Sequence, residues 1–472
     1  MSANARGRTL WLATTELWER FTFYGLRAIL VLHLVAAPAA GGFGVSDAEA
    51  AAVYGLFAAT VYLSALPGGV LADRVLGPVR AIWVAGGAML LGNMILSSAR
   101  GMVMFGFGLA LVALGAGTLK ASIVPMVARA AQQEGRSLDG ALTLFYVGIN
   151  VGGVGGPLLA AGLAQKFGWW AGYAIASAGM GLALVTYSRV APHLAEPGDA
   201  LRRPSTAVIA TLLLAALLIS ALVQAVPPTV LIRGVLGVVV LCAVGGFIYL
   251  HRHAADARER ANVRKLAGLF CGAVVFWAAG EQAGVSLTLF AQRFTDRSLG
   301  GLAVPAAWFQ SLNPAYVVVL APLFAVLWLR LGRRGTEPDA VAKFAAGLIA
   351  GGGALAIAAA GADGAGGAAV SPLWLVATYL LLAVGEILLS PIGLGAAARF
   401  APASHVALAT GLWFLSLGFG GLLAGLTGSL FDLGSARGFA AAFGSIAAIL
   451  ASVGVIFMIM ARRTRVTPAS VD

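Results

Sequence analysis

Long apolar segments follow one another along almost the whole chain, with only short polar stretches between them. Each is close to the roughly 20 residues that a helix needs to cross a bilayer. Hydrophobic residues make up 60% of the 472 residues and charged residues only 11%, whereas a soluble domain carries about 25% charged residues. The sequence therefore predicts an all-α integral membrane protein rather than a series of soluble domains.

We predict fourteen transmembrane helices from these segments. They cover residues 10–36, 47–73, 79–99, 102–128, 140–164, 168–190, 205–225, 229–250, 264–292, 304–331, 341–361, 371–398, 405–431 and 437–461. An even number of spans places both termini on one side of the membrane. Most of the 31 lysine and arginine residues lie in loops on that same side, which predicts cytoplasmic termini by the positive-inside rule. The formal charge of +12 is thus a topology signal and does not indicate nucleic-acid binding.

Two of the segments, residues 205–225 and 229–250, contain almost no polar side chain except at their ends. We interpret them as an inserted hairpin that faces lipid and carries no chemistry. The predicted organisation is a six-helix bundle over residues 1–195, a linker with the hairpin over 196–262, and a second six-helix bundle over 263–472.

Seven ionisable side chains lie inside predicted spans, where a charge is costly and usually functional. They are the acids Glu16, Glu19, Glu281 and Glu386 and the bases Arg20, Arg27 and Lys120. Their charges nearly cancel, as switchable ion pairs in a central cavity require.

The first span holds four of these charges, in and just after the stretch ELWERFTFYG. At about 100° per residue, its polar side chains fall within one arc of roughly 140°. The side chains in this arc are Glu16, Glu19, Arg20, Tyr24 and Arg27. They therefore face one cavity or one partner. The structural alternative is a simple i,i+4 ion pair of Glu16 with Arg20, which leaves Glu19 and Arg27 without partners on this helix.

Other spans also carry polar pairs on one face. The i,i+4 pairs are Tyr146 with Asn150, Trp277 with Glu281, and Glu386 with Ser390. Taken singly, each pair is also consistent with an ordinary hydrogen-bonded contact between helices. Together with Lys120, they place carboxylates, cations, phenols and an amide on several helices. Proton relays and sites for zwitterions are built from such groups.

These motifs resemble the proton-coupled oligopeptide transporter family of the major facilitator superfamily, along essentially the whole chain. ELWERFTFYG resembles the family signature of the first helix, and FYVGINVGG resembles that of the fifth. FQSLNPAYVVVLAPLF, FWAAGEQ and GEILLSP are similar to further family patterns. The resemblance implies a major facilitator fold of 6+6 helices with a two-helix insertion.

The resemblance also implies roles for individual residues. Those linked to proton coupling are Glu16, Glu19, Arg20, Glu281 and Glu386. Those expected to bind substrate are Tyr24, Arg27, Tyr62, Lys120, Tyr146, Asn150, Trp277, Asn313, Glu386, Ser390 and Trp413. Arg27 and Lys120 would receive the carboxylate of a peptide and Glu386 its amino group. In the empty protein, Lys120 is expected to pair with Glu386, and Arg27 with Glu281.

Two positions depart from the family pattern. Phe23 stands where many members have a tyrosine, so one hydroxyl is missing near the site. LKASIV replaces the usual Lys-Pro-Asn sequence, which is expected to straighten the helix beside Lys120. Both departures leave the detailed substrate range open.

The expected function is import of di- and tripeptides across the bacterial inner membrane by a monomer, driven by the proton gradient without a cofactor or metal. The expected partners are peptides, protons and the lipid bilayer, and no nucleic acid. The alternatives are a proton-linked drug or anion transporter of the same superfamily, or a peptide sensor that does not transport. An enzyme is disfavoured because the sequence shows no nucleophile–base pair or set of metal ligands.

Overall fold

The computed structural model describes residues 7–195, 206–366, 368–402 and 405–466, and these are almost entirely helical. The chain forms two compact units. The first contains Met1–Leu231 and Val304–Ala315, and the second contains Ile232–Ala303 and Tyr316–Asp472. This grouping places α8 in the first unit and most of α9 in the second. The boundaries predicted at residues 195 and 263 stay predictions.

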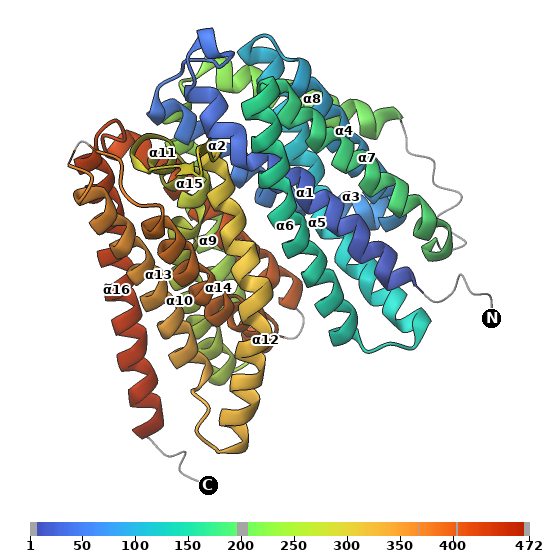
Figure 1. Cartoon of the computed structure of the whole chain (residues 1–472). Helices are drawn as coiled ribbons and strands as arrows, with labels where there is room; N and C mark the ends of the chain where they lie inside the picture. The colour runs from blue at the N-terminus through green and yellow to red at the C-terminus, as the bar shows by residue number, and fades with distance from the viewer. Residues whose placement is uncertain (1–6, 196–205, 367, 403–404, 467–472) are drawn as a thin grey trace. The chain divides into compact units, whose positions relative to one another are not determined.

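The first unit is a bundle in which α1 is central, since it packs against both α6 and α7 (Figure 1). Its helices are α1 (Arg8–Val35), α2 (Asp47–Leu63), α3 (Ala65–Leu71), α4 (Pro78–Ser98), α5 (Met102–Glu134), α6 (Leu138–Phe167), α7 (Trp169–Leu194) and α8 (Thr206–Ala225). Shorter turns are η2 (Pro38–Ala40), a π-helical turn η3 (Ala72–Leu76) and η6 (Ala306–Ser311).

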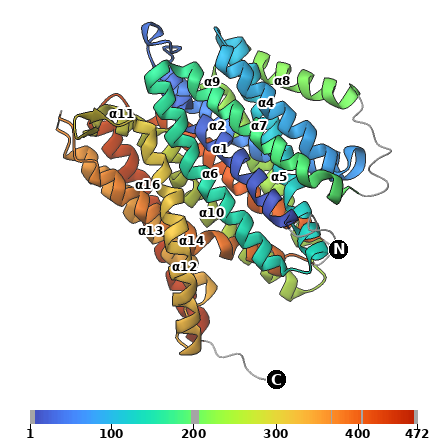
Figure 2. The same ribbon diagram turned by 45° about the vertical axis from the view of Figure 1, so that its right-hand side comes forward.

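In the second unit α13 packs against both α14 and α16 (Figure 2). The helices are α9 (Pro228–Arg252), α10 (Ala257–Gly280), η5 (Glu281–Gly284), α11 (Ser286–Phe294), α12 (Leu312–Arg333), α13 (Ala340–Asp363), α14 (Leu373–Phe400), α15 (Val406–Leu430) and α16 (Ala436–Val466). The first four residues of α12 belong to the first unit. A two-stranded hairpin, β1 (Ser298–Leu299) with β2 (Leu302–Ala303), precedes η6.

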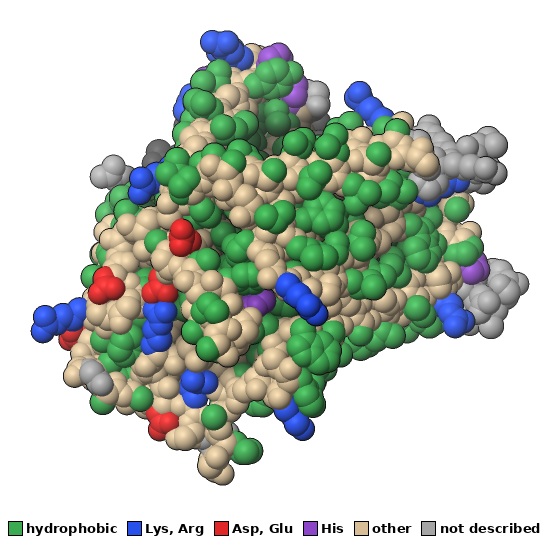
Figure 3. All heavy atoms as spheres, turned by 90° about the horizontal axis from the view of Figure 1, so that it is seen from above, with side chains coloured by type: hydrophobic (Ala, Val, Ile, Leu, Met, Phe, Trp, Pro, Cys, Tyr) green, Lys and Arg blue, Asp and Glu red, His purple; other side chains and the backbone are tan. Residues whose placement is uncertain are grey.

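Thirteen helical segments of the described chain are long and apolar enough to cross a membrane. The predicted first span, α1, is not among them because its charged residues interrupt the apolar sequence. With α1 included, the fourteen predicted spans are confirmed, each within several residues of its predicted range. Hydrophobic side chains also cover much of the face seen in Figure 3, with basic side chains scattered among them. The chain is a multi-pass membrane protein.

Glycines on α6 explain how α1 and α6 come into close contact. A Cβ on Gly152 would lie 2.1 Å from the carbonyl oxygen of Leu17, and one on Gly156 would lie 2.3 Å from that of Phe21. Gly148, one turn earlier, contacts the backbone of α1 in the same way. Small residues allow backbones of membrane helices to approach closely. The GINVGGVGG stretch is therefore a packing surface for α1.

The N-terminus of α1 is capped by a carboxylate from another helix. Glu134, the last residue of α5, accepts hydrogen bonds from the backbone of Gly7 at 2.8 Å and from the hydroxyl of Thr9 at 2.7 Å. The backbone amides of Arg8 and Thr9 also donate to it. The first turn of a helix has amides without partners inside the helix, so this carboxylate ties α1 to α5.

One side of α8 is docked on α5 rather than exposed. The Ser220 hydroxyl donates to the carbonyl oxygen of Val103 at 2.8 Å, and Ala216 is buried in one cluster with Ala110 and Leu111. The expectation that the hairpin faces lipid therefore holds for most of the surface of α8, but not for this side. The small side chains Ala216 and Ser220 make the close approach feasible.

Candidate functional site

Three charged side chains form a buried cluster in the middle of α1. Arg20 Nε lies 2.8 Å from Glu16 Oε1, and Arg20 also contacts the carboxylate of Glu19. The exposed fractions are 3% for Glu16, 0% for Glu19 and 5% for Arg20. The expectation that Glu19 has no partner on its own helix is therefore wrong. The long arginine side chain reaches a neighbour at i−1 as well as the one at i−4.

This cluster is held from outside α1 by close backbone packing. A Cβ on Gly152 of α6 would lie 3.0 Å from the Cβ of Arg20, and one on Gly153 would lie 3.4 Å from the Tyr24 ring. Thr22, on another face of α1, donates its hydroxyl to the carbonyl oxygen of Ala176 on α7 at 2.9 Å. The polar arc of α1 is therefore fixed in rotation by the two helices that flank it.

Lys120 lies beside the aromatic side chains next to this cluster. Its Nζ is 5.0 Å from the ring centroid of Phe23 and 4.4 Å from that of Tyr62. The guanidinium carbon of Arg20 is 5.3 Å from the same Phe23 ring. These are cation–π distances, so one ring contacts two cations. Lys120 also interacts electrostatically with the Glu19 carboxylate. The helix α5 continues without a break past Lys120.

Arg27 lies between two tyrosine rings. Its guanidinium carbon is 5.9 Å from the centroid of Tyr24 and 5.6 Å from that of Tyr54. Tyr54 is buried on α2 and was not among the site residues predicted from the sequence. The sequence spacing could have indicated Tyr54 as a site residue. It lies eight residues before the predicted site residue Tyr62, which places the two side chains about 80° apart around one helix.

The start of α12 adds an amide to the first unit. Ser311 donates its hydroxyl to the carbonyl oxygen of Val154 on α6 at 2.9 Å, and Pro314 contacts Gly153. Asn313 between them is therefore held against α6, the helix that carries Asn150. The side-chain amide of Asn150 donates to the carbonyl oxygen of Tyr146 at 2.9 Å. This bond lies within α6 and joins Asn150 to the backbone of Tyr146 rather than to another helix. The Tyr146 side chain is exposed.

In the second unit, Glu281 lies where a membrane helix is broken. The sequence predicted one helix over 264–292, but α10 ends at Gly280 and Glu281 begins the 3₁₀ turn η5. Gln282 stabilises the break: its amide nitrogen donates to Thr427 Oγ1 on α15 at 2.9 Å, and its oxygen accepts from Ser286 at 2.5 Å. Buried acids at interrupted helices are typical of transporter sites.

The remaining predicted residues of this unit lie on adjacent helices. A Cβ on Gly385 of α14 would lie 2.7 Å from the ring of Phe276 on α10. The two helices are therefore in contact at the residue directly before Glu386. A Cβ on Gly393 would lie 1.7 Å from the ring of Trp413, which is buried directly against α14. Glu386, Ser390 and Gly393 follow one another at helical spacing. Trp413 therefore lies on the same face of α14 as Glu386 and Ser390.

Comparisons with known proteins agree on one family. The model of the POT family matches residues 79–463. The chain belongs to the POT family. The peptide transporter YePEPT of Yersinia enterocolitica is 36% identical over 88% of this chain and 86% of its own length. The di-/tripeptide transporter of Lactococcus lactis subsp. cremoris is 31% identical over 86% of each chain. A crystal structure of peptide transporter POT in complex with sulfate has a TM-score of 0.86 and 30% identity, and the match covers 97% of this chain and 94% of that one.

Membership of the POT family confirms the resemblance and the major facilitator fold. The POT family is a family of transporters. Within the first unit the structure brings Glu16, Glu19 and Arg20 together, with Lys120 beside them. The predicted pairs of Lys120 with Glu386 and of Arg27 with Glu281 join residues of different units and stay predictions.

Proposed function

We propose that this POT family member is a proton-coupled symporter that imports di- and tripeptides across the bacterial inner membrane by alternating access. The relatives named as peptide transporters support the substrate class. The observation that carries the proposal is the buried cluster of Glu16, Glu19 and Arg20 beside Lys120. Both termini are proposed to lie in the cytoplasm, on the positive-inside argument.

The charges of this cluster couple protonation of Glu19 to peptide binding. With Glu16 and Glu19 ionised, the two carboxylates balance the charges of Arg20 and Lys120. Addition of a proton to Glu19 removes one negative charge and weakens its hold on both cations. The cluster then carries an excess positive charge, which the carboxylate of an incoming peptide neutralises. Protonation and peptide binding therefore favour each other.

The two ends of a peptide would engage different units. Arg27 and Lys120 of the first unit would bind the carboxylate, and Glu386 of the second would bind the ammonium group. The tyrosine rings around Arg27 and the Trp413 ring would provide apolar walls, and apolar burial is non-directional. Such a site accepts varied side chains while it requires both charged ends.

Acids of the second unit would complete the cycle. Without substrate, Glu386 would pair with Lys120 and Glu281 with Arg27, so each pair would join the two units. Loss of a carboxylate charge on protonation, or competition from the peptide termini, would release these pairs. Rocking of two bundles around a central site is the usual mechanism for this class of transporter.

The alternatives make different predictions for binding and flux. A drug or anion carrier would not need Lys120 together with two acids in its first helix. Dipeptides should displace a fluorescent dipeptide from the purified protein if it has a peptide site, and this result would distinguish it from a drug or anion carrier. A peptide sensor would bind the same dipeptides but would give no flux in liposomes.

The test uses purified protein in liposomes with radiolabelled alanyl-alanine. When the outside is acidic by one pH unit, the wild type should accumulate peptide about tenfold for each coupled proton. Glu19→Gln should abolish this accumulation while peptide-driven counterflow continues. Glu49→Gln is the matched control, because Glu49 belongs to a capping box on α2 in which glutamine serves equally. Accumulation by Glu19→Gln that still follows the pH gradient would contradict the proposed role.

A further inference from the structure

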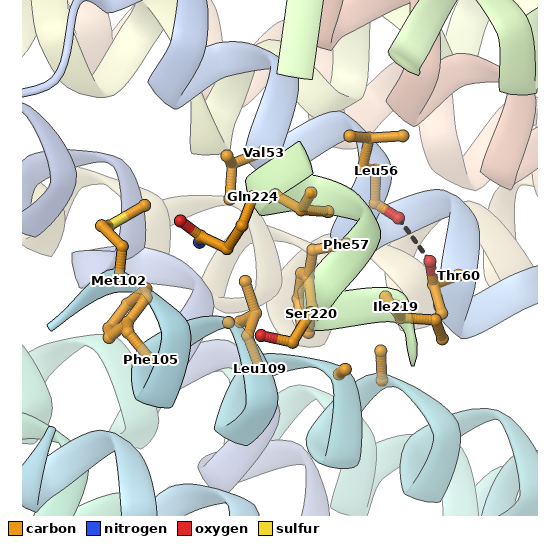
Figure 4. Close-up of a pocket in the computed structure, with 14 residues that line it drawn as sticks. Val53, Leu56, Phe57, Thr60, Met102, Phe105, Leu109, Ile219, Ser220 and Gln224 are labelled. Carbon is orange, nitrogen blue, oxygen red and sulfur yellow. Dashed lines mark hydrogen bonds between the residues drawn. The ribbon is translucent and has the colours of Figure 1, made fainter. Parts of the chain in front are cut away.

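A groove lies within the first unit, between α2, α5 and α8, and its empty space together with the open solvent at its mouth is about 510 Å³. Its walls are mainly apolar and include Phe57, Phe105, Leu109 and Ile219 (Figure 4). None of its lining residues is among those assigned to transport above, and Phe57 of its wall stacks on Phe23 of α1. The predicted inert hairpin thus forms one wall of a binding space.

The wall from α8 is held in a fixed position. Besides the hydrogen bond from Ser220 to Val103, a Cβ on Gly106 would lie 3.0 Å from the Ser220 hydroxyl oxygen. The two helices therefore touch along the floor of the groove. A groove with fixed walls does not need to be reorganised when a ligand enters, which favours binding.

The two hydroxyl groups inside the groove, those of Thr60 and Ser220, are already used by the protein, and the amide of Gln224 lies at one end. The Thr60 hydroxyl donates to the carbonyl oxygen of Leu56 at 2.7 Å (Figure 4), and Ser220 donates to α5 as described. Since a buried polar ligand would need hydrogen-bond partners, an occupant of this groove should be apolar along its length.

The dimensions of the groove match one leaflet of a membrane. Its lining on α5 extends from Met102 to Ala113, which is about 16 Å at 1.5 Å per residue. Half of a hydrocarbon core of about 30 Å is nearly the same length. Met102 is the first residue of α5, and Gln224 lies in the last turn of α8. One end of the groove is therefore near a membrane surface, and its other end is near the bilayer midplane.

A basic side chain stands at the end near the surface. Arg100 precedes Met102 by two residues and is exposed. In Figure 4, Met102 and Gln224 lie at the same end of the groove, away from Thr60 and Ile219. A guanidinium group at this position suits the phosphate of a lipid headgroup.

We propose that this groove binds one acyl chain of an anionic phospholipid, with the lipid phosphate at Arg100. The chain would lie between α2, α5 and α8 in the leaflet on the side of Arg100. It would fill the space behind the hairpin helix and contribute to holding α8 on α5. The inserted hairpin would then form a lipid-binding element of the first unit.

The first test uses wild-type protein in nanodiscs that contain phosphatidylglycerol with a diazirine on one acyl chain. Photolysis should label the lining of α5 and α8, residues 102–113 and 219–224, several-fold more than the exposed lipid-facing surface of α9. Even labelling over α9 and the groove would overturn the proposal. So would cross-linked dimers in which a second copy of the chain covers the groove and excludes the lipid.

The second test counts phosphatidylglycerol retained after delipidation, by native mass spectrometry. Val223→Trp fills the groove and should lower retention at least about tenfold, whereas Leu222→Trp, the neighbouring exposed position, should keep it. Arg100→Gln should remove the preference for phosphatidylglycerol over phosphatidylethanolamine, and Arg233→Gln on α9 should not. Equal retention by both tryptophan variants would contradict the site. If Val223→Trp does not fold, labelling of the wild type decides.

Discussion

Phe23 contacts two cations of the first unit at once. Its ring lies within cation–π distance of both Arg20 and Lys120, and it stacks on Phe57 with centroids 5.9 Å apart. The missing hydroxyl noted from the sequence is thus less important than the face of the ring, which phenylalanine and tyrosine share. The ring thus contacts two like charges without a negative charge of its own.

Loss of this ring should weaken peptide binding. One cation–π contact contributes about 0.5–2 kcal/mol, so loss of the contact with Lys120, which is proposed to bind the peptide carboxylate, should raise the Kd of Phe23→Leu for alanyl-alanine roughly 2- to 30-fold. Phe23→Tyr keeps the ring face and should stay within about twofold of the wild type. Isothermal titration measures both, with the melting temperature of each variant as the control for folding. Wild-type affinity in Phe23→Leu would show that the ring does not position the cations.

At the scale of elements, the α1–α6 contact depends on the absence of a side chain. Gly152→Ala would place a methyl group 2.1 Å from a backbone oxygen of α1, and backbone atoms cannot turn aside as a side chain does. We expect a loss of about 1–3 kcal/mol in stability, typical of overpacking. Gly181→Ala on α7 is the control, because nothing lies within 4 Å of its Cβ. It should be neutral or stabilising by about 0.5–1 kcal/mol.

Thermal unfolding of the two variants in the same detergent measures this difference. Gly152→Ala should also reduce transport in proportion to the displacement of Arg20, whose Cβ lies 3.0 Å from the new methyl group. Equal melting temperatures for Gly152→Ala and Gly181→Ala would mean that the two helices are not locked by this contact.

The helices were predictable from sequence, whereas their interruptions were not. Length and apolarity decide where a span lies, and both can be read along the chain. The break after Gly280 depends on Gln282, whose partner Thr427 lies on another helix. Similarly, the polar arc of α1 was predictable from periodicity, but the contact of Arg20 with Glu19 depends on a side-chain conformation. Neither the contact between two distant helices nor the conformation of one side chain can be read from the local sequence pattern.

At the scale of the whole molecule, proton symport of a neutral dipeptide moves one positive charge for each coupled proton. A membrane potential of 100 mV, negative inside, adds about 2.3 kcal/mol per charge. It should therefore drive roughly fiftyfold accumulation of alanyl-alanine for each coupled proton when no pH gradient is present. A potassium diffusion potential set with valinomycin provides this condition in liposomes. Liposomes with equal potassium on both sides are the control, and uptake that ignores the potential would exclude electrogenic symport.

The charged cluster of α1 also affects how the protein is made. This helix precedes in the chain the helices that bury it, yet it falls outside the apolar set found among the described residues. A charged residue at the centre of an inserting helix costs about 2.5–3.5 kcal/mol, and the contacts of Arg20 with two glutamates offset part of this within α1 itself. The helices that bury it, α6 and α7, begin only at residue 138. The charged span α1 therefore reaches the membrane before the helices that bury it, so it has to be retained at the translocon until they emerge.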